Sequence, residues 1–322
     1  MTEAVEPPAV SPRRILWNDT ERRPRAPFRL LATPVVFVVV SLAVGLSLST
    51  ALGDLAQSSR LVSLVVSLVS VGASGLAALV VARYVDRRTV ADLGLGLDRE
   101  WAADLGFGLA LGTGLMTVVF VVGVAAGWIA VSPAPLGVDR LLGVGSLLAF
   151  FVVVGIAEEL LLRGIVLTDV AEGLRWRFDP DAAVAGGLVI SSAVFGVAHY
   201  ANPNAGLTST LSITLAGVML GLGYALTGDL AIPTGVHISW NFVQGGVFGF
   251  AVSGLDFGTS LVETTERGPD VITGGAFGPE AGLLGVGAIV LGAVCIAAYV
   301  RARRGDLGFD PSVTVPDLRW KK

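Results

Sequence analysis

The sequence predicts an all-α protein, a polytopic bundle of about eight transmembrane helices, and two observations support this fold class. Hydrophobic residues make up 53% of the 322 residues and charged residues only 15%, and the mean hydropathy is +0.75. Apolar runs of about 20 residues, enough for an α-helix to cross a hydrocarbon core of about 30 Å, recur along the chain. This composition excludes a soluble fold, so we expect a multi-pass protein of the cell membrane that contacts the lipid bilayer throughout.

The apolar runs follow one another from residue 30 onward and are separated by short polar segments. They cover residues 30–52, 61–83, 103–131, 142–168, 183–201, 208–227, 230–252 and 281–300. The third and fourth runs are longer than one crossing requires, so we expect them to tilt or to contain a break. Glycine pairs four residues apart, such as Gly108 and Gly112, allow the helices to pack closely.

Three regions are predicted along the chain. Residues 1–29 carry six arginines and no apolar period, which predicts a disordered basic leader. Residues 30–302 form the transmembrane helical domain, with the chemically informative motifs between about 142 and 252. Residues 303–322 form a C-terminal tail. The single cysteine, Cys295, excludes an internal disulfide and a thiolate metal cluster.

Basic residues predict the orientation of the helices in the membrane. With the N-terminus in the cytoplasm, 18 Arg and Lys residues fall in cytoplasmic segments and three, Arg60, Arg140 and Arg267, in outer ones. This imbalance places both termini in the cytoplasm. The net charge of −4 argues against a nucleic-acid partner.

The fourth apolar run contains an acidic turn, Glu158 and Glu159, followed by Arg163. A charge within a membrane helix costs roughly 2.5–3.5 kcal/mol on insertion scales, so such residues usually serve a function. Glu159 and Arg163 are four residues apart and share a helical face, which predicts a supporting ion pair. Glu158 lies about 100° around the helix and is left free.

Two further polar motifs lie in apolar runs. Phe195 and His199 are four residues apart, as are His237 and Asn241, and the chain has no other histidines. For any one of these residues an interhelical hydrogen bond that serves packing alone is about as expected as a functional role. The presence of such polar residues in three membrane helices is much better explained by one shared site.

The residue types suit hydrolysis of an amide. Glu158 can take a proton from water as general base, with His199 positioning that water or sharing the acid–base role. His237 and Asn241 can donate hydrogen bonds to the oxyanion that forms on a peptide carbonyl. A metal-dependent alternative stays open, because two His and one carboxylate form a known zinc set, here Glu158, His199 and His237. The chain lacks the compact His-Glu-x-x-His zinc motif.

One geometrical difficulty remains in this assignment. At 1.5 Å per residue, Glu158 and His237 lie in the cytoplasmic half of the bilayer, whereas His199 lies just before Asn202 and Pro203, which should end its helix on the outer side. The difference in depth is roughly 10–15 Å. Either the fifth helix ends inside the protein, above a cavity, or the predicted boundaries are displaced.

The motifs together resemble those of the CPBP intramembrane proteases, a family that includes the CAAX prenyl endopeptidases and the bacteriocin-processing and immunity proteins (the Abi family). Glu-Glu-x-x-x-Arg at 158–163, Phe-x-x-x-His at 195–199 and His-x-x-x-Asn at 237–241 occur in the same order on separate helices. The resemblance implies a protease that cuts a peptide near or within the membrane, with Glu158 and His199 as its water-activating pair. It implies oxyanion stabilisation by His237 and Asn241 and a supporting pair of Glu159 and Arg163. It leaves metal dependence, with Zn²⁺ as the candidate cofactor, undecided.

Two other classes of function fit some of these observations. An ion-coupled transporter also places Glu and His in the membrane, but the chain shows no second copy of the acidic turn, as an inverted repeat would require. A catalytically silent scaffold would keep the polar cluster for packing. For the peptidase, the expected partner is a peptide or protein substrate, lipidated or not.

Overall fold

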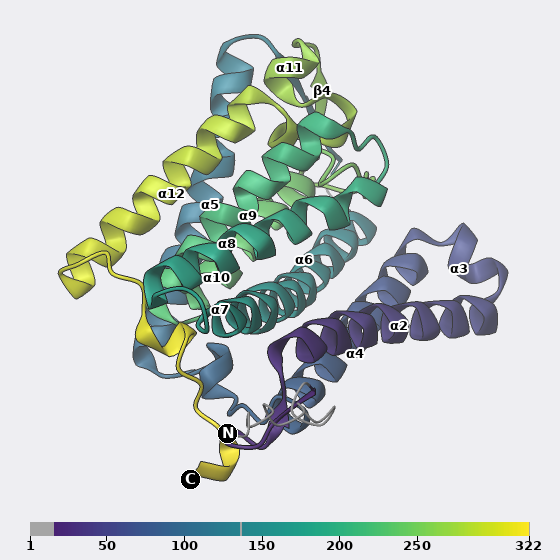
Figure 1. Ribbon diagram of the computed structural model, residues 1–322. Coiled ribbons are helices and arrows are strands. Elements are labelled where there is room, and N and C mark those ends of the chain that lie inside the picture. The colour runs from purple at the N-terminus through teal and green to yellow at the C-terminus, as the bar shows by residue number, and fades with distance from the viewer. Residues whose placement is uncertain (1–15, 136, 322) are drawn as a thin grey trace, which may run out of the picture.

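The computed structural model describes residues 16–135 and 137–321 of the chain. Within this part, seven helices are long and apolar enough to cross a membrane. Figure 1 shows them as a bundle of long helices, with both ends of the chain at the same end of the molecule. A polytopic helical bundle is therefore confirmed as the fold class, while its orientation in the membrane stays a prediction.

The first two membrane helices form an antiparallel pair. Helix α2 (Ala26–Leu52) packs along α4 (Arg60–Tyr84), and the short helix α3 (Asp54–Ser58) connects them. Helix α4 packs against α6 (Val138–Glu159), and the first turns of α2 contact the segment that follows α6 through the ion pairs of Arg29 with Asp169 and Glu172. In Figure 1 the far end of this pair stands away from the other helices.

Helix α10 (Ala231–Asn241) lies in the centre of the remaining helices and has ten consecutive buried residues, Ala231 to Trp240. It packs most extensively on α5 (Arg99–Ala125) and also contacts α6 and α9 (Leu207–Thr227). A Cβ atom added to Gly108 would lie 2.5 Å from the Ile232 carbonyl oxygen, so the α5–α10 crossing requires glycine there. Helices α8 (Pro180–Ala198) and α12 (Leu283–Arg304) flank α9.

Two predicted spans differ from the observed helices. The run 230–252 forms α10 and a π-helical continuation, Phe242–Val247, and is too short to be counted among the seven long helices. It ends early because the chain turns back at Gly249, whose φ of 71° is left-handed. The third run ends as a helix at Ala125, and residues 129–133 form a strand instead. The fourth run contains the expected irregularity, a π-helical segment at Leu160–Leu167 between α6 and α7 (Thr168–Leu174).

Residues 16–29 of the predicted leader form secondary structure, whereas residues 1–15 lie outside the described residues. Strands β1 (Trp17–Asn18) and β2 (Arg23–Pro24) pair, and α2 begins at Ala26. Order results from buried ion pairs that a sequence pattern does not show. We call the residues of these ion pairs the terminal cluster: Arg23, Arg29, Arg88, Asp92, Asp169 and Glu172.

The C-terminal tail also packs on the bundle. The Asp310 amide donates to the Ala225 carbonyl, and Leu318 is fully buried beside Arg88, with which it forms a β-bridge. The Trp320 Nε1–H donates to the Glu21 carbonyl, so the two described ends of the chain contact each other.

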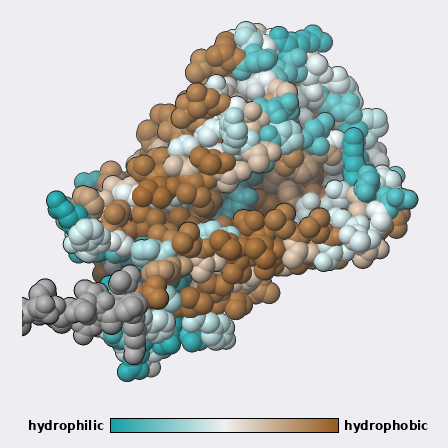
Figure 2. Space-filling model, turned by 45° about the vertical axis from the view of Figure 1, so that its right-hand side comes forward, coloured by the Kyte–Doolittle hydropathy of each residue, from teal (hydrophilic) through white to brown (hydrophobic). Residues whose placement is uncertain are grey.

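At the opposite end of the molecule, strands β3 (Ile129–Pro133) and β4 (Val262–Glu266) form an antiparallel pair, with the short helix α11 (Asp270–Thr273) nearby. In Figure 2 hydrophobic residues cover a broad area of the visible face, and hydrophilic residues gather toward its ends. This distribution fits a protein whose middle lies in lipid.

Candidate active site

The acidic turn ends α6, and the π-helical segment Leu160–Leu167 begins directly after it. Arg163 donates to Glu159 Oε1 over 2.8 Å, the pairing predicted from their spacing, and both side chains are fully buried. The second terminal nitrogen of Arg163 donates to the Gly217 carbonyl on α9 at 3.1 Å. The pair therefore joins the acidic turn to a neighbouring helix and keeps the buried charges neutral as a pair.

His237 meets both carboxylates of the turn. Its Nδ1 lies 2.8 Å from Glu159 Oε1 and its Nε2 lies 3.9 Å from Glu158 Oε2. An ionised carboxylate only accepts hydrogen bonds, so Nδ1 carries a proton and donates to Glu159. The Glu158 side chain is 28% exposed, and its buried Oε2 has no hydrogen-bond partner among the described residues. Glu158 thus stays outside the pair made by Glu159 and Arg163.

His199 follows the last residue of α8 and opens a short 3₁₀ turn, His199–Ala201. Its Nδ1 lies 2.7 Å from the Phe195 carbonyl oxygen. Because a carbonyl can only accept, Nδ1 is the protonated nitrogen, and Nε2 of the neutral ring has a free lone pair. The i, i+4 spacing of the motif therefore fixes which nitrogen of His199 can accept a proton.

The Phe195 ring lies at the centre of the three motifs. It contacts the His199 and His237 rings edge-on, with centroid separations of 4.6 and 5.9 Å, and the Arg163 guanidinium lies 4.8 Å from its centroid. The sequence marked Phe195 as a motif position but gave it no role. Its contacts show that it packs the two histidines against the ion pair.

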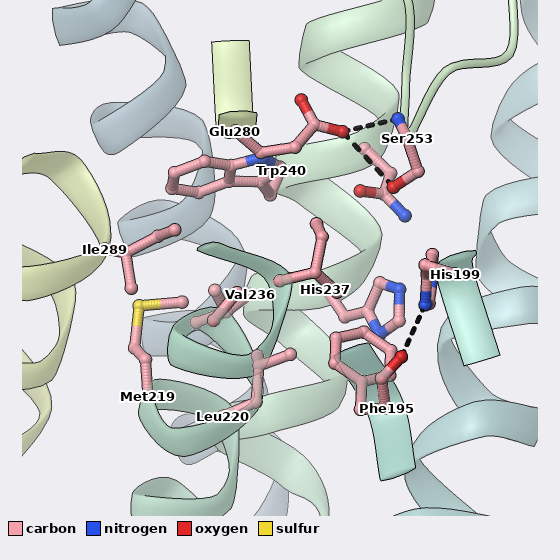
Figure 3. Close-up of a pocket in the computed structure, with 13 residues that line it drawn as sticks. Phe195, His199, Met219, Leu220, Val236, His237, Trp240, Ser253, Glu280 and Ile289 are labelled. Carbon is pink, nitrogen blue, oxygen red and sulfur yellow. Dashed lines mark hydrogen bonds between the residues drawn. The ribbon is translucent and has the colours of Figure 1, made fainter. Parts of the chain in front are cut away.

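A pocket of about 50 Å³ brings the later motifs together. Its polar lining comes from His199, His237, Asn241, Ser253 and Glu280, and apolar residues that include Met219, Val236 and Ile289 form the rest (Figure 3). Glu158 does not line this pocket and adjoins it through His237. Helix α8 ends at Ala198, and His199 lines the pocket together with His237, so the two histidines meet although α8 is long enough to cross a membrane.

Sequence reasoning missed the carboxylate at the other end of this pocket. Glu280 is buried, and burial raises its pKa to about 7, while hydrogen bonds from Ser253 and Gln244 act in the opposite direction. It precedes the last apolar run and belongs to no spaced motif. The only sequence signal is an acidic residue placed directly before a membrane helix.

Both helical motifs that carry carboxylate or amide groups are followed by π-helical turns. Leu160–Leu167 follows Glu159, and Phe242–Val247 follows Asn241. A π-helical turn contains an additional residue and is frequent at functional sites, because it changes the direction of side chains within a helix.

The three residues of the predicted zinc set are not gathered at one point in this geometry. Glu158 and His237 face each other, but residues 16–135 and 137–321 contain no group of three or more His, Cys, Asp or Glu side chains arranged to hold a metal ion. A site made of Glu158, His199 and His237 would need these side chains to come closer together. Zinc binding stays a prediction.

The fold and the pocket define a class first: a multi-pass helical membrane protein with a polar site between its helices. Comparison with known proteins adds a family likeness over about a third of the chain. Residues 140–243 match the family model described as Type II CAAX prenyl endopeptidase Rce1-like, and all three motifs lie inside the match. The family resemblance is confirmed for this region. No curated protein and no solved structure matches the chain.

Proposed function

We propose that the protein is an intramembrane endopeptidase that hydrolyses a peptide bond near or within the membrane with a water molecule activated by Glu158 and His199. The observation that carries the proposal is the pocket that brings His199, His237 and Asn241 together beside the unpartnered Glu158 Oε2. The family match supports a protease that acts on a peptide or protein in the membrane. A lipidated substrate, as in CAAX processing, belongs to this proposal.

Glu158 serves as general base in the proposed mechanism. Its free oxygen takes a proton from water, and the His199 Nε2 lone pair orients this water as a hydrogen-bond acceptor. The hydroxide attacks the carbonyl carbon and forms a tetrahedral oxyanion. The proton then passes to the leaving nitrogen, the C–N bond breaks, and a carboxylate and an amine result.

The oxyanion would be stabilised by the Asn241 amide and by His237. Since His237 Nδ1 already donates to Glu159, the ring can donate from Nε2 only when both nitrogens carry a proton. The oxyanion role therefore requires His237 as imidazolium. In its neutral form His237 would accept at Nε2 and assist Glu158 with the water instead.

Cleavage of a quenched fluorescent peptide library, with and without a prenyl group, tests the proposal. The purified wild type and Glu158→Ala would be compared, each with and without a chelator. We expect cleavage by the wild type that is lost in the variant, and chelator sensitivity would show the zinc-dependent form. Equal signals from two folded proteins would remove Glu158 from catalysis and favour transport or a scaffold.

A further inference from the structure

Glu280 is held at the roof of the pocket by hydrogen-bond donors from two other segments. One carboxylate oxygen accepts from the Ser253 backbone N–H and, at 3.2 Å, from the Ser253 hydroxyl. The other accepts from the Gln244 side-chain amide. Figure 3 shows the contacts to Ser253 across the pocket from both histidines. No salt bridge of Glu280 occurs within the described residues, so hydrogen-bond donors hold the carboxylate.

The first branch from Glu280 leads to the helix of His237 and Asn241. The Trp240 Nε1–H donates to Gln244 Oε1 at 2.8 Å, which fixes the orientation of the Gln244 amide. Its nitrogen must then point away and donates to the Ala251 carbonyl at 2.6 Å and to Glu280. The orientation thus follows from Trp240, which can only donate. Through Gln244, Glu280 holds in place the π-helical turn that follows Asn241.

The second branch leads to the turn of His199. The Asn202 side-chain amide donates to the Ser253 carbonyl at 2.9 Å, and the Asn202 backbone N–H donates to the His199 carbonyl at 3.1 Å. A continuous path therefore runs from Glu280 through Ser253 and Asn202 to His199. Neither branch passes through the acidic turn of α6.

The backbone conformation at Ser253 and Gly254 indicates that the contacts around Ser253 are a fixed part of the fold. Ser253 has a φ of 49°, a left-handed conformation that non-glycine residues rarely adopt, so its contacts must compensate the strain. The next residue, Gly254, has a φ of 84° and lies so close to the Pro203 carbonyl oxygen that an added Cβ would stand 1.9 Å away. The segment that carries Ser253 thus packs tightly on the loop after His199.

We propose that Glu280 is a positioning residue, which holds the His199 turn and the helix of His237 and Asn241 at a fixed separation across the pocket. The geometric part of this proposal rests only on the two hydrogen-bond paths that start at Glu280. Its catalytic consequence rests on the proposed function, since a displacement of about 1 Å in a catalytic group can cost 10²-fold in rate. A carboxylate suits this task because it accepts donors on both oxygens at once.

Histidine-labelled NMR of the full-length protein in detergent tests the geometric part without any cleavage. The chain has only two histidines, so each ring gives its own signal, assigned with His199→Gln. We expect Glu280→Gln to shift both signals, because an amide offers one acceptor and cannot serve Ser253 and Gln244 together. Asn202→Ala should shift the His199 signal alone.

Glu263→Gln is the matched control, because Glu263 lies at the same end of the molecule, is exposed, and pairs with Arg140. It should leave both signals in place. If Glu280→Gln does not fold, Ser253→Ala removes only the hydroxyl donor and should shift both signals by a smaller amount. Unchanged signals in a folded Glu280→Gln, or equal shifts in the control, would overturn the proposal.

Kinetics test the catalytic consequence. Glu280→Gln should lower kcat roughly 10- to 100-fold with KM little changed. Combined with Asn202→Ala, the loss should be smaller than the product of the single losses, because both changes interrupt one path. Additive losses would contradict the shared path. If the wild type cleaves no peptide, the proposed function fails, and the NMR signals still decide on the positioning.

Discussion

Two buried clusters of opposite charges lie in the protein, and they differ in what remains free. In the site cluster, Glu158, Glu159, Arg163 and His237, one carboxylate makes no ion pair with the arginine and adjoins a pocket. In the terminal cluster, the single carboxylate of Glu172 accepts from three arginines, Arg23, Arg29 and Arg88. We infer that both burials are compensated by pairing, but that only the site cluster places a partly exposed carboxylate beside a pocket.

The largest expected effect is a loss of activity when the free carboxylate of the site cluster is removed. Glu158→Gln keeps the shape of the side chain and removes the base, so we expect kcat to fall about 10²- to 10⁴-fold. Thermal unfolding should change little, because the Glu158 side chain is 28% exposed and Arg163 stays paired with Glu159. Peptide cleavage and thermal unfolding in detergent measure the two quantities. A large loss of stability with modest loss of kcat would contradict the assignment.

The next largest effect is a loss of stability, and we expect it in both clusters. Glu159→Ala leaves the buried Arg163 without its acidic partner, and Glu172→Ala removes one acidic partner from three buried arginines at once. We expect each change to cost about 3–5 kcal/mol in the free energy of unfolding. Thermal or denaturant unfolding would measure this loss, with Glu158→Ala as the control. If Glu172→Ala unfolds like the wild type, the terminal cluster does not hold the chain ends.

A pH series sharpens the comparison with a buried carboxylate that belongs to neither cluster. The pKa of Glu280 is about 7 in the folded protein, raised by burial from its usual value of 4.5. Between these values the folded protein keeps a proton that the unfolded chain has released. The free energy of unfolding should therefore fall by about 3 kcal/mol as the pH rises from 4.5 to 7. In Glu280→Gln this part of the slope should vanish, and an unchanged slope would assign it to other groups.

The smallest effect concerns an exposed pair. Arg140 donates to Glu263 over 2.9 Å, with their side chains 22% and 54% exposed. Solvent screens such pairs, so Arg140→Ala should reduce the free energy of unfolding by less than about 1 kcal/mol. A loss as large as that of Glu172→Ala would show that exposure does not separate the two kinds of pair.

What the sequence predicts depends on how far apart the partners lie. The pairing of Glu159 with Arg163 and the turn of His199 onto Phe195 follow from four-residue spacing, and the long apolar runs show the helical bundle. The terminal cluster does not follow, because Arg29 and Glu172 are 143 residues apart. The contact of His237 with Glu159 joins positions 78 residues apart, so the order of motifs predicted a shared site but not which ring nitrogen is used.

The missed parts have physical causes as well. Glu280 lies outside any helical period, and only the packing of two loops makes it part of the pocket. The hydropathy of the seventh run does not distinguish a helix that crosses lipid from one that lies inside the bundle, so it could not show that α10 is a short core helix. Secondary structure in residues 16–29 could not be predicted, because their arginines find their partners in distant helices.

The π-helical segment Leu160–Leu167 places a constraint on the length of the chain. It separates Glu159 of the site cluster from Asp169 and Glu172 of the terminal cluster, all within one continuous run of helix. Removal of one residue there would rotate everything that follows by about 100°. Either Arg163 or the terminal acids would then face the wrong neighbours. Relatives with the same two clusters should therefore vary in side chains across this stretch but show no insertions or deletions in it.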